Sequence, residues 1–209
     1  ALSMLEEMVQ RDWHHPSILM WSVNNECATD TKEGLDFNRL LVNRARELDH
    51  TRLVTFATDR PLTDLTLSLY DVIGINKYYG WYGGKVEGFA QFLEDYHEYA
   101  ATQGAEDKPI IMSEFGGAGI FGDVGWEDER MFSEDYQAHI LEESLRIFRS
   151  DPKIVGTYIW QFADIRSDTI RFRDRARGFN NKGILNEYRK PKQAFKTVRS
   201  IYSEGPPQH

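Results

Sequence analysis

The sequence predicts an α/β fold in which parallel strands alternate with helices. Two observations support this prediction. Short runs rich in β-forming residues alternate along the chain with longer segments whose apolar residues recur at helical spacing. The short runs are also apolar at successive positions, as expected of parallel strands covered by helices on both faces. The 209 residues are 41% hydrophobic and 28% charged, which is typical of a globular chain.

The first quarter of the chain is predicted to contain a helix, a strand and a second helix. Residues 1–12 have helical apolar spacing, and His15-Pro16 ends this pattern because a residue before proline avoids the helical region. Residues 17–23 form an apolar run that predicts a buried strand, and residues 36–47 again have helical spacing. The apolar face of this second helix is expected to carry Phe37, Leu40, Leu41 and Leu48.

The rest of the chain continues the alternation. Further strands are expected at residues 52–58, 70–76 and 154–162, and within 108–117, where a strand runs into a glycine-rich loop. Further helices are expected at residues 88–104 and 133–150 and after Pro191, with room for a short helix at 62–69. Ser133 is a good N-cap for one of them, and Gly104 is a common kind of helix end. The last two helices are expected to bury Tyr136, Ile140, Leu141, Leu145 and Phe148, and Phe195, Val198 and Ile201, respectively.

Five strands in this order suggest part of a larger barrel. A complete (β/α)8 TIM barrel takes about 250 residues, and five strands do not suit a closed barrel. We therefore expect residues 1–209 to form the C-terminal five or so βα units of a (β/α)8 TIM barrel. We also expect the natural sequence to begin before residue 1, with the first barrel strands and N-terminal β-domains absent here, because the chain opens in the middle of a helical pattern.

Composition excludes several classes of function. The net charge of −8 argues against nonspecific binding to nucleic acid or an anionic membrane. The single cysteine, Cys27, excludes a disulfide within the chain. The sequence shows neither a membrane-spanning apolar segment nor a signal peptide. A cytoplasmic location is the first expectation, and any N-terminal export signal would lie before residue 1. His14-His15 lacks a carboxylate at ligand spacing and no phosphate-binding glycine loop occurs, so no metal and no cofactor are expected.

Polar and aromatic residues follow the predicted strands, where parallel α/β folds place their chemistry. The strand ends carry Asn24, Asn25 and Glu26; Thr58 and Asp59; Asn76 and the aromatic residues of 77–82; Ser113 and Glu114; and Trp160, Gln161 and Asp164. Two glutamates at strand ends suit glycoside hydrolysis, in which one carboxylic acid protonates the leaving oxygen while one carboxylate attacks the sugar. The alternative is that each glutamate pairs with an arginine at the rim of the barrel.

Five motifs resemble the catalytic barrel of family 2 glycoside hydrolases, and most closely its β-glucuronidase type. They are RDWHHPSILMWSVNNE, NKYYGWY, IIMSEFGG, IWQFAD and NNKGILNEYRKPKQAF, and they span about residue 8 to residue 203. The resemblance implies a retaining β-glycosidase that hydrolyses β-D-glucuronides through a covalent glycosyl-enzyme intermediate. Carboxyl groups of a retaining enzyme lie about 5–5.5 Å apart.

The resemblance also implies a role for each matching residue. Glu26 corresponds to the general acid/base and Glu114 to the nucleophile, while Asn25 is expected to bind the sugar hydroxyl next to the reacting carbon. The other residues expected at the substrate are Tyr78 and Tyr82 near the nucleophile, Trp160 in the pocket wall, and Asn180 and Lys182 on the substrate carboxylate with Asn76 as their helper. A lysine is a compact cation suited to a carboxylate, so Lys182 would select glucuronides over neutral galactosides.

The sequence departs from the family at several positions. Ala176 stands where β-glucuronidases commonly use an arginine, which Arg175 or Arg177 could replace. The arginines of 171–177 are otherwise expected to form a solvated loop. Asn24 stands where alanine or glycine is usual. Cys27 has no base beside it in the sequence, so it is not expected to act as a nucleophile.

Two alternatives to a glucuronidase remain open at this point. Some relatives with NNKG are β-galactosidases, so a β-galactosidase of the same family is the first. The second is a catalytically incomplete barrel fragment that pairs its open sheet edges with another chain, either a complementary barrel fragment or a second copy in a homo-oligomer.

Overall fold

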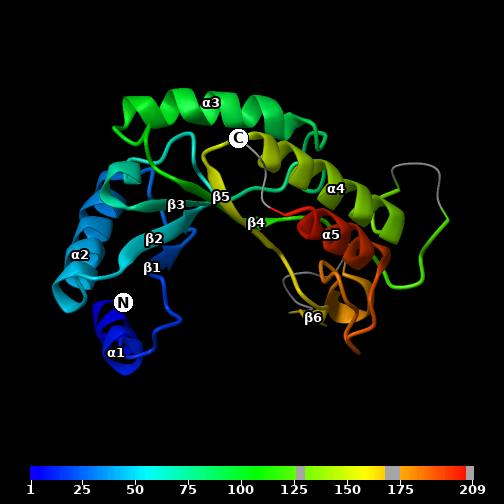
Figure 1. Ribbon diagram of the computed structural model, residues 1–209, viewed down its shortest axis with the longest axis horizontal. Helices are drawn as coiled ribbons and strands as arrows, with labels where there is room; N and C mark the ends of the chain where they lie inside the picture. Colours follow the sequence, from blue (N-terminus) through cyan, green and yellow to red (C-terminus); the bar gives the residue numbers. More distant parts are fainter. Residues whose placement is uncertain (126–129, 168–174, 206–209) are drawn as a thin grey trace. The chain divides into compact units, whose positions relative to one another are not determined.

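The computed structural model describes residues 1–125, 130–167 and 175–205 and confirms the α/β prediction. A five-stranded sheet has the strand order β1-β2-β3-β4-β5 (Figure 1). Its strands are β1 (Met20–Asn25), β2 (Leu53–Thr58), β3 (Val72–Asn76), β4 (Ile110–Phe115) and β5 (Ile154–Ile159). The pairs β1–β2 and β2–β3 are parallel, and the alternation with helices is that of a partial (β/α) barrel.

Five helices accompany the sheet in the described part of the chain. They are α1 (Leu2–Asp12), α2 (Lys32–Leu48), α3 (Gly88–Thr102), α4 (Glu134–Ser150) and α5 (Gln193–Ser203), with 3-10 turns η1 (Leu67–Leu69) and η2 (Ala176–Gly178). A small antiparallel sheet of β6 (Ile165–Arg166) and β7 (Phe179–Asn180) was not predicted, because two-residue strands leave no periodic pattern. No helix of the described residues is both long and apolar enough to cross a membrane.

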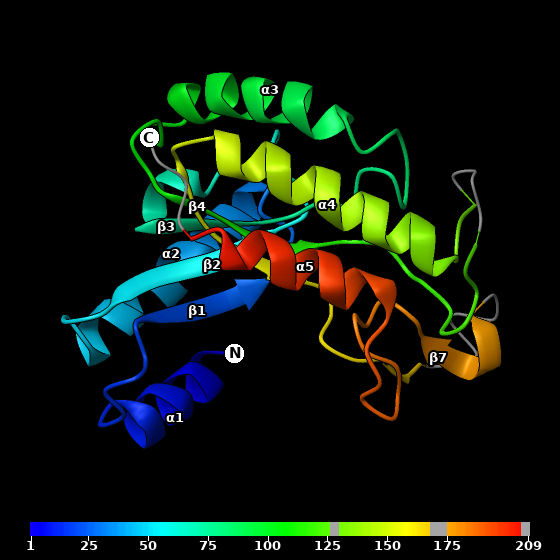
Figure 2. The ribbon, with the colours of Figure 1, turned by 45° about the vertical axis from the view of Figure 1, so that its right-hand side comes forward.

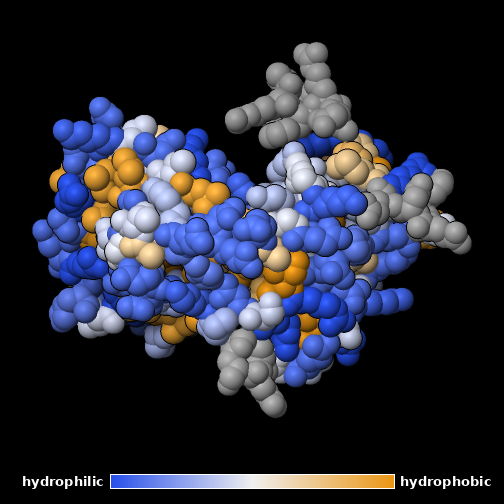
Figure 3. Space-filling model, turned by 90° about the horizontal axis from the view of Figure 1, so that it is seen from above, coloured by the Kyte–Doolittle hydropathy of each residue, from blue (hydrophilic) through white to orange (hydrophobic). Residues whose placement is uncertain are grey.

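The chain forms two compact units. The first comprises Ala1–Asn76, Phe92–Ser113 and Lys153–Gly156, and the second comprises Lys77–Gln91, Glu114–Pro152 and Thr157–His209. Strands β4 and β5 and helix α3 contribute residues to both units. The face in Figure 3 is largely hydrophilic, with hydrophobic side chains in separate small areas, in keeping with the net charge of −8.

In the first unit, β2 and β3 are buried almost throughout, as the prediction of strands covered on both faces requires. Helix α1 packs against α2 (Figure 1), and α1 buries Leu5 and Val9. The two strands approach so closely that a Cβ on Gly74 would lie 2.2 Å from the Phe56 carbonyl oxygen. Only glycine therefore fits at that position of β3.

Two predictions for the first unit were wrong in detail. The strand predicted at 17–23 begins only at Met20 and ends at Asn25, because the backbone first completes a turn in which the Ile18 amide donates to the His15 carbonyl. Helix α2 leaves Phe37 and Leu40 exposed. Its buried face carries the predicted Leu41 together with Asn38, Val42 and Ala45, and the polar Asn38 hid the rest of this face from the apolar pattern.

In the second unit, α4 packs beside α5 (Figure 2). The Ser133 hydroxyl accepts a hydrogen bond from the Tyr136 amide, which confirms the predicted N-cap. The residues predicted for these two helix faces are buried except Tyr136 and Phe195, which are half-buried. Phe148 of α4 meets Phe89 and Phe115 edge to face, with ring centres 4.8 and 5.0 Å away.

Strand β5 departs from the prediction that every strand is covered on both faces. It stands at one end of the strand order, and its Val155 and Tyr158 side chains are 64% and 63% exposed. At the other end, Leu19 beside β1 is 74% exposed. Both ends of the sheet thus present apolar side chains to solvent.

Candidate active site

The first unit brings together Asn25, Glu26 and Asn76 at the C-terminal ends of β1 and β3. The buried Asn76 amide nitrogen donates to Asn25 Oδ1 at 3.0 Å and to Glu26 Oε1 at 2.9 Å. Ser113 Oγ donates to Asn76 Oδ1 at 2.7 Å, which fixes the orientation of that amide. Asn76 therefore orients both neighbouring polar side chains, whereas Asn25 and Glu26 are themselves exposed to solvent.

Glu26 occupies an unusual backbone conformation. Its φ is +50°, in the left-handed region that non-glycine residues seldom adopt and that costs about 1–3 kcal/mol. The register of the β1–β2 pair shifts between Ser22 and Asn25, and the Glu26 amide still donates to the Ala57 carbonyl at 2.9 Å. A bulge of this kind at a strand end redirects the next side chain. Strain at an exposed carboxylate is typical of a functional residue.

Asn24 has a structural role that the sequence did not reveal. Its amide nitrogen donates to Asn38 Oδ1 on α2 and to the Tyr70 hydroxyl, which in turn donates to Asn38 Oδ1 at 2.7 Å. Burial raises the pKa of Tyr70, so this hydroxyl stays protonated and available as a donor. The network fixes the end of β1 to α2 directly before Asn25 and Glu26.

The second unit contains the other candidate carboxylate, Glu114, at the end of β4. The Tyr78 hydroxyl donates to Glu114 Oε2 at 2.7 Å, and the Lys77 amide donates to the Glu114 carbonyl at 2.9 Å. A hydrogen bond from a phenol to a carboxylate stabilises the ionised form, which is the form that a nucleophile needs. Glu26 and Glu114 belong to different units, and their shared pocket stays a prediction from the sequence.

Lys182 lies within a group of aromatic side chains. Its Nζ donates to the Tyr82 hydroxyl at 2.7 Å. The same nitrogen lies 4.5, 5.1 and 5.4 Å from the ring centres of Tyr82, Trp81 and Tyr78, respectively. These distances are typical of cation–π contacts, which hold a desolvated ammonium in place. Tyr78 and Tyr82 also meet edge to face at 5.3 Å, so the two tyrosines connect Glu114 to Lys182.

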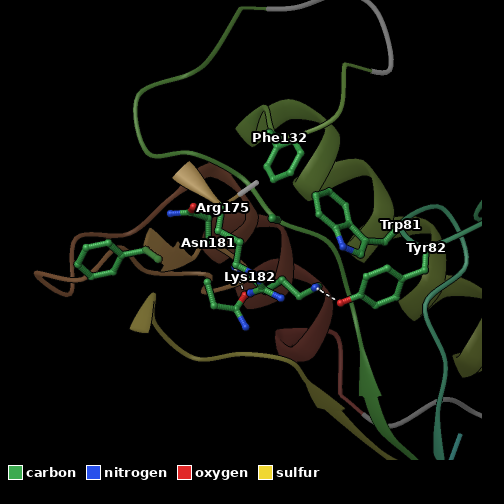
Figure 4. A pocket seen from close by; sticks show the side chains of 9 residues that line it. Trp81, Tyr82, Phe132, Arg175, Asn181 and Lys182 are labelled. Atoms are coloured by element: carbon green, nitrogen blue, oxygen red, sulfur yellow. Dashed lines mark hydrogen bonds between the residues drawn. The ribbon is translucent and has the colours of Figure 1, made fainter. Parts of the chain in front are cut away.

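An open pocket surrounds this lysine within the second unit (Figure 4). Its lining residues are Trp81, Tyr82, Ala118, Phe132, Arg175, Phe179, Asn180, Asn181 and Lys182. Two basic and two amide side chains thus share a partly aromatic cavity, an arrangement suited to a small polar anion with a ring. The sequence did not predict Phe132 as a pocket residue, because it belongs to none of the motifs that resemble the family.

The structure distinguishes between the two arginines considered as second cations. Arg175 lines the pocket. Arg177 pairs with Glu187 at 2.9 Å and stands over the Phe179 ring at 5.6 Å. The remaining arginines of the predicted loop, at 171 and 173, lie outside the described residues.

Trp160 and Asn180 complete the predicted set. The Trp160 amide donates to the Phe115 carbonyl at 3.0 Å, one residue after Glu114, and its side chain is partly exposed. Trp160 is not among the residues that line the pocket around Lys182, whereas Asn180 is. Asn180 Oδ1 accepts a hydrogen bond of 3.3 Å from the Lys182 amide, so the two proposed carboxylate ligands are locally coupled.

Cys27 and the histidines form no metal-binding group in the part of the chain that the structure describes. The hydrogen bond of Cys27 Sγ runs to the Asn25 carbonyl at 3.8 Å. Across residues 1–125, 130–167 and 175–205, no group of three or more His, Cys, Asp or Glu side chains is arranged to hold a metal ion.

Comparison with known proteins places these residues in a family context. Residues 1–205 match the family model for glycosyl hydrolases family 2, TIM barrel domain. A β-glucuronidase from Sus scrofa is 38% identical over 210 residues, covering 96% of this chain and 31% of that protein. A β-glucuronidase from Paenibacillus borealis is 34% identical, covering 96% of this chain and 33% of that protein.

Solved structures of family 2 enzymes also resemble the chain. A family 2 β-galacturonidase from Eisenbergiella tayi bound to galacturonate has a TM-score of 0.91 and 32% identity, covering all of this chain and 37% of that one. A β-D-glucuronidase from Dictyoglomus thermophilum has a TM-score of 0.87 and 32% identity, covering all of this chain and 36% of that one. The chain thus spans about a third of the length of the relatives it matches.

Proposed function

The chain belongs to the TIM barrel domain of family 2 glycosyl hydrolases, and from this premise we propose that the protein hydrolyses β-D-glucuronides with retention of configuration. The observation that carries the proposal is the pocket around Lys182, which joins a buried ammonium to Asn180 and Arg175. A site of this composition suits a sugar that carries a carboxylate. The names of the relatives at 34–38% identity support the same substrate class.

The proposed reaction has two steps. In the first, Glu114 attacks the anomeric carbon, the bond to the leaving oxygen breaks, and Glu26 gives its proton to that oxygen. In the second, Glu26 takes a proton from water, the water oxygen attacks the anomeric carbon, and the ester bond to Glu114 breaks. The Tyr78 hydrogen bond supports the ionised Glu114 that enters the first step and leaves in the second.

Asn25 and Asn76 have separate proposed tasks. Asn25, which is exposed, would bind the sugar hydroxyl next to the reacting carbon. Asn76 donates to both Asn25 and Glu26, so its proposed contribution is to position them. This assignment differs from the helper role at the substrate carboxylate that the resemblance implies. Tyr82 and Trp160 would border the bound sugar through their partly exposed rings.

The test of the substrate class compares two aryl glycosides in the intact protein. We expect hydrolysis of the β-D-glucuronide to be preferred over the β-D-galactoside in kcat/KM. Lys182→Met should lower kcat/KM for the glucuronide by about 30-fold or more, since a desolvated charge pair is worth about 2–5 kcal/mol. Lys190→Met serves as the matched control, because Lys190 is exposed. A galactoside preference that Lys182→Met leaves unchanged would favour the β-galactosidase alternative.

A second candidate substrate is a β-galacturonide, which keeps the carboxylate and inverts one hydroxyl. The structural similarity to a β-galacturonidase, with a TM-score of 0.91, favours including it. The preference of the parent enzyme between the aryl β-glucuronide and the aryl β-galacturonide separates the two candidates. Lys182→Met should impair hydrolysis of both equally, since both sugars carry the carboxylate. Preference for the galacturonide would leave the carboxylate assignment intact and change only the sugar.

A further inference from the structure

A fully buried ion pair lies beneath the segment that carries Asn180 and Lys182. Lys192 Nζ donates to Asp164 Oδ1 at 2.8 Å, and both side chains are 0% exposed. The same ammonium donates to the Asn181 carbonyl at 3.0 Å and to the Gly119 carbonyl at 2.5 Å. Lys192 therefore joins the start of α5 to the segment 180–183 and to the loop that follows Glu114 and β4.

The carboxylate of the pair holds the residues on both sides of Lys182. Asp164 Oδ1 accepts from the Gly183 amide at 3.0 Å, and Asp164 Oδ2 accepts from the Asn181 side chain at 3.1 Å. The approach at Gly183 is so close that a Cβ there would lie 2.2 Å from the Asp164 amide nitrogen. The single Asp164 carboxylate thus holds both neighbours of Lys182, the side chain of Asn181 and the backbone of Gly183.

A further buried side chain fixes the same segment to the loop after Glu114. The Gln137 amide nitrogen donates to the Gly117 carbonyl at 2.9 Å and to the Gly183 carbonyl at 3.1 Å. The Gly119 amide donates to the Asn181 carbonyl at 3.0 Å. The segment with the proposed carboxylate ligands and the loop that follows the proposed nucleophile therefore share one set of anchors.

Stability alone gives little reason for this ion pair. Burying two charges carries a desolvation cost that their attraction often fails to exceed, and apolar replacements of similar volume are frequently neutral or stabilising. Burial raises the pKa of the Asp164 carboxyl and lowers the pKa of the Lys192 ammonium, because it disfavours the charged form of each group. The pair instead supplies directed bonds to Asn181, Gly119 and Gly183, which apolar side chains could not make.

We propose that Asp164 and Lys192 are positioning residues that set substrate selectivity by fixing the place of Asn180 and Lys182. The inference rests on the proposed function, because it takes Lys182 as the ligand of a substrate carboxylate. A misplacement of about 1 Å in such a group can reduce the rate about 100-fold. Loss of the pair should therefore impair anionic substrates more than neutral ones.

The test measures kcat/KM for aryl β-D-glucuronide and aryl β-D-galactoside in Asp164→Asn and in the double variant Asp164→Leu/Lys192→Met. Asp164→Asn keeps the shape of the side chain and removes its charge. We expect the glucuronide-to-galactoside ratio to fall about 10- to 100-fold in both variants. We also expect the double variant to melt at a higher temperature than Asp164→Asn, because it leaves no unpaired charge buried.

Asp49→Asn is the matched control. Asp49 is a buried carboxylate of the first unit and is bound by Trp21, Thr51 and Arg52. The control should lose stability and keep the ratio. A readout independent of turnover is hydrogen exchange of the amides of Asn181, Lys182 and Gly183 in the intact protein, which should become faster in both pair variants and stay unchanged in the control.

The outcomes separate the inference from the function on which it rests. A parent enzyme without glucuronide preference, or with a ratio insensitive to Lys182→Met, contradicts the proposed function. A parent that shows both properties, together with a folded pair variant that keeps the parent ratio and the parent exchange rates, contradicts the positioning role. If the double variant does not fold, Asp164→Asn and its exchange rates decide the question on their own.

Discussion

Removal of the Tyr78 hydroxyl tests the proposed role of Glu114 as the nucleophile. In Tyr78→Phe the ring stays and the 2.7 Å hydrogen bond to Glu114 Oε2 is lost. A hydrogen bond to a charged group contributes about 1.5–3 kcal/mol, and about 1.4 kcal/mol corresponds to a tenfold change in rate. The bond supports the carboxylate that departs when the glycosyl-enzyme ester is cleaved. The second step should therefore slow about 10- to 150-fold.

The assay is a pre-steady-state burst with an aryl β-D-glucuronide whose phenol leaves readily. In Tyr78→Phe the burst of phenol should persist while the following steady rate falls, because the ester accumulates. Tyr188→Phe is the matched control, since Tyr188 is 76% exposed, and it should behave as the parent. A steady rate for Tyr78→Phe within about threefold of the parent would show that this hydrogen bond does not stabilise the departing Glu114 carboxylate.

Three further predictions concern the other parts of the fold. Asn76→Ala leaves Glu26 without its amide donor, and kcat/KM should fall about 10-fold or more for glucuronide and galactoside alike, as steady-state kinetics would show. Burial opposes ionisation of Asp49, but hydrogen bonds from Thr51, Arg52 and Trp21 outweigh burial and hold the pKa of Asp49 well below its usual range. The ionised Asp49 therefore stabilises the fold above about pH 4, and this stabilisation is lost as the pH falls below that value. Urea unfolding from pH 6 to pH 3 should show this loss, and Asp49→Asn should flatten it. Residues 1–209 alone should self-associate through the exposed sheet ends, and Val155→Lys with Tyr158→Lys should shift light scattering toward the monomer; a parent that is already monomeric would contradict this.

The fold could be predicted from the sequence because its strands and helices carry regular apolar patterns. Predictions failed where a polar residue is buried or an apolar residue is exposed. Asn38 is buried on α2 and bonded to Asn24 and Tyr70, so the apolar pattern identified only part of the buried face of that helix. The exposed Val155 and Tyr158 on β5 were also missed, because apolar content predicts burial without saying which elements supply the cover.

The candidate site divides in the same way. Residues with distinctive chemistry at strand ends, such as Glu26, Glu114 and Lys182, could be named from spacing and resemblance. The contacts that orient them could not, because they join residues far apart in the chain. Lys182 and Tyr82 are 100 positions apart and meet at 2.7 Å. Lys192 looks in sequence like an ordinary basic residue before a helix, and only its complete burial against Asp164 shows otherwise.

Covalent trapping of the intact protein would identify the nucleophile directly. A 2-deoxy-2-fluoro-β-D-glucuronide with a good leaving group should form a stable ester. The fluorine destabilises the oxocarbenium-like transition states of both steps, whereas the good leaving group speeds only the formation of the ester. Mass spectrometry of the digested protein is predicted to locate the added glucuronyl group on Glu114, in the peptide that carries Ser113 and Phe115. An enzyme that hydrolyses glucuronides but yields no adduct, or an adduct on another carboxylate, would contradict the account.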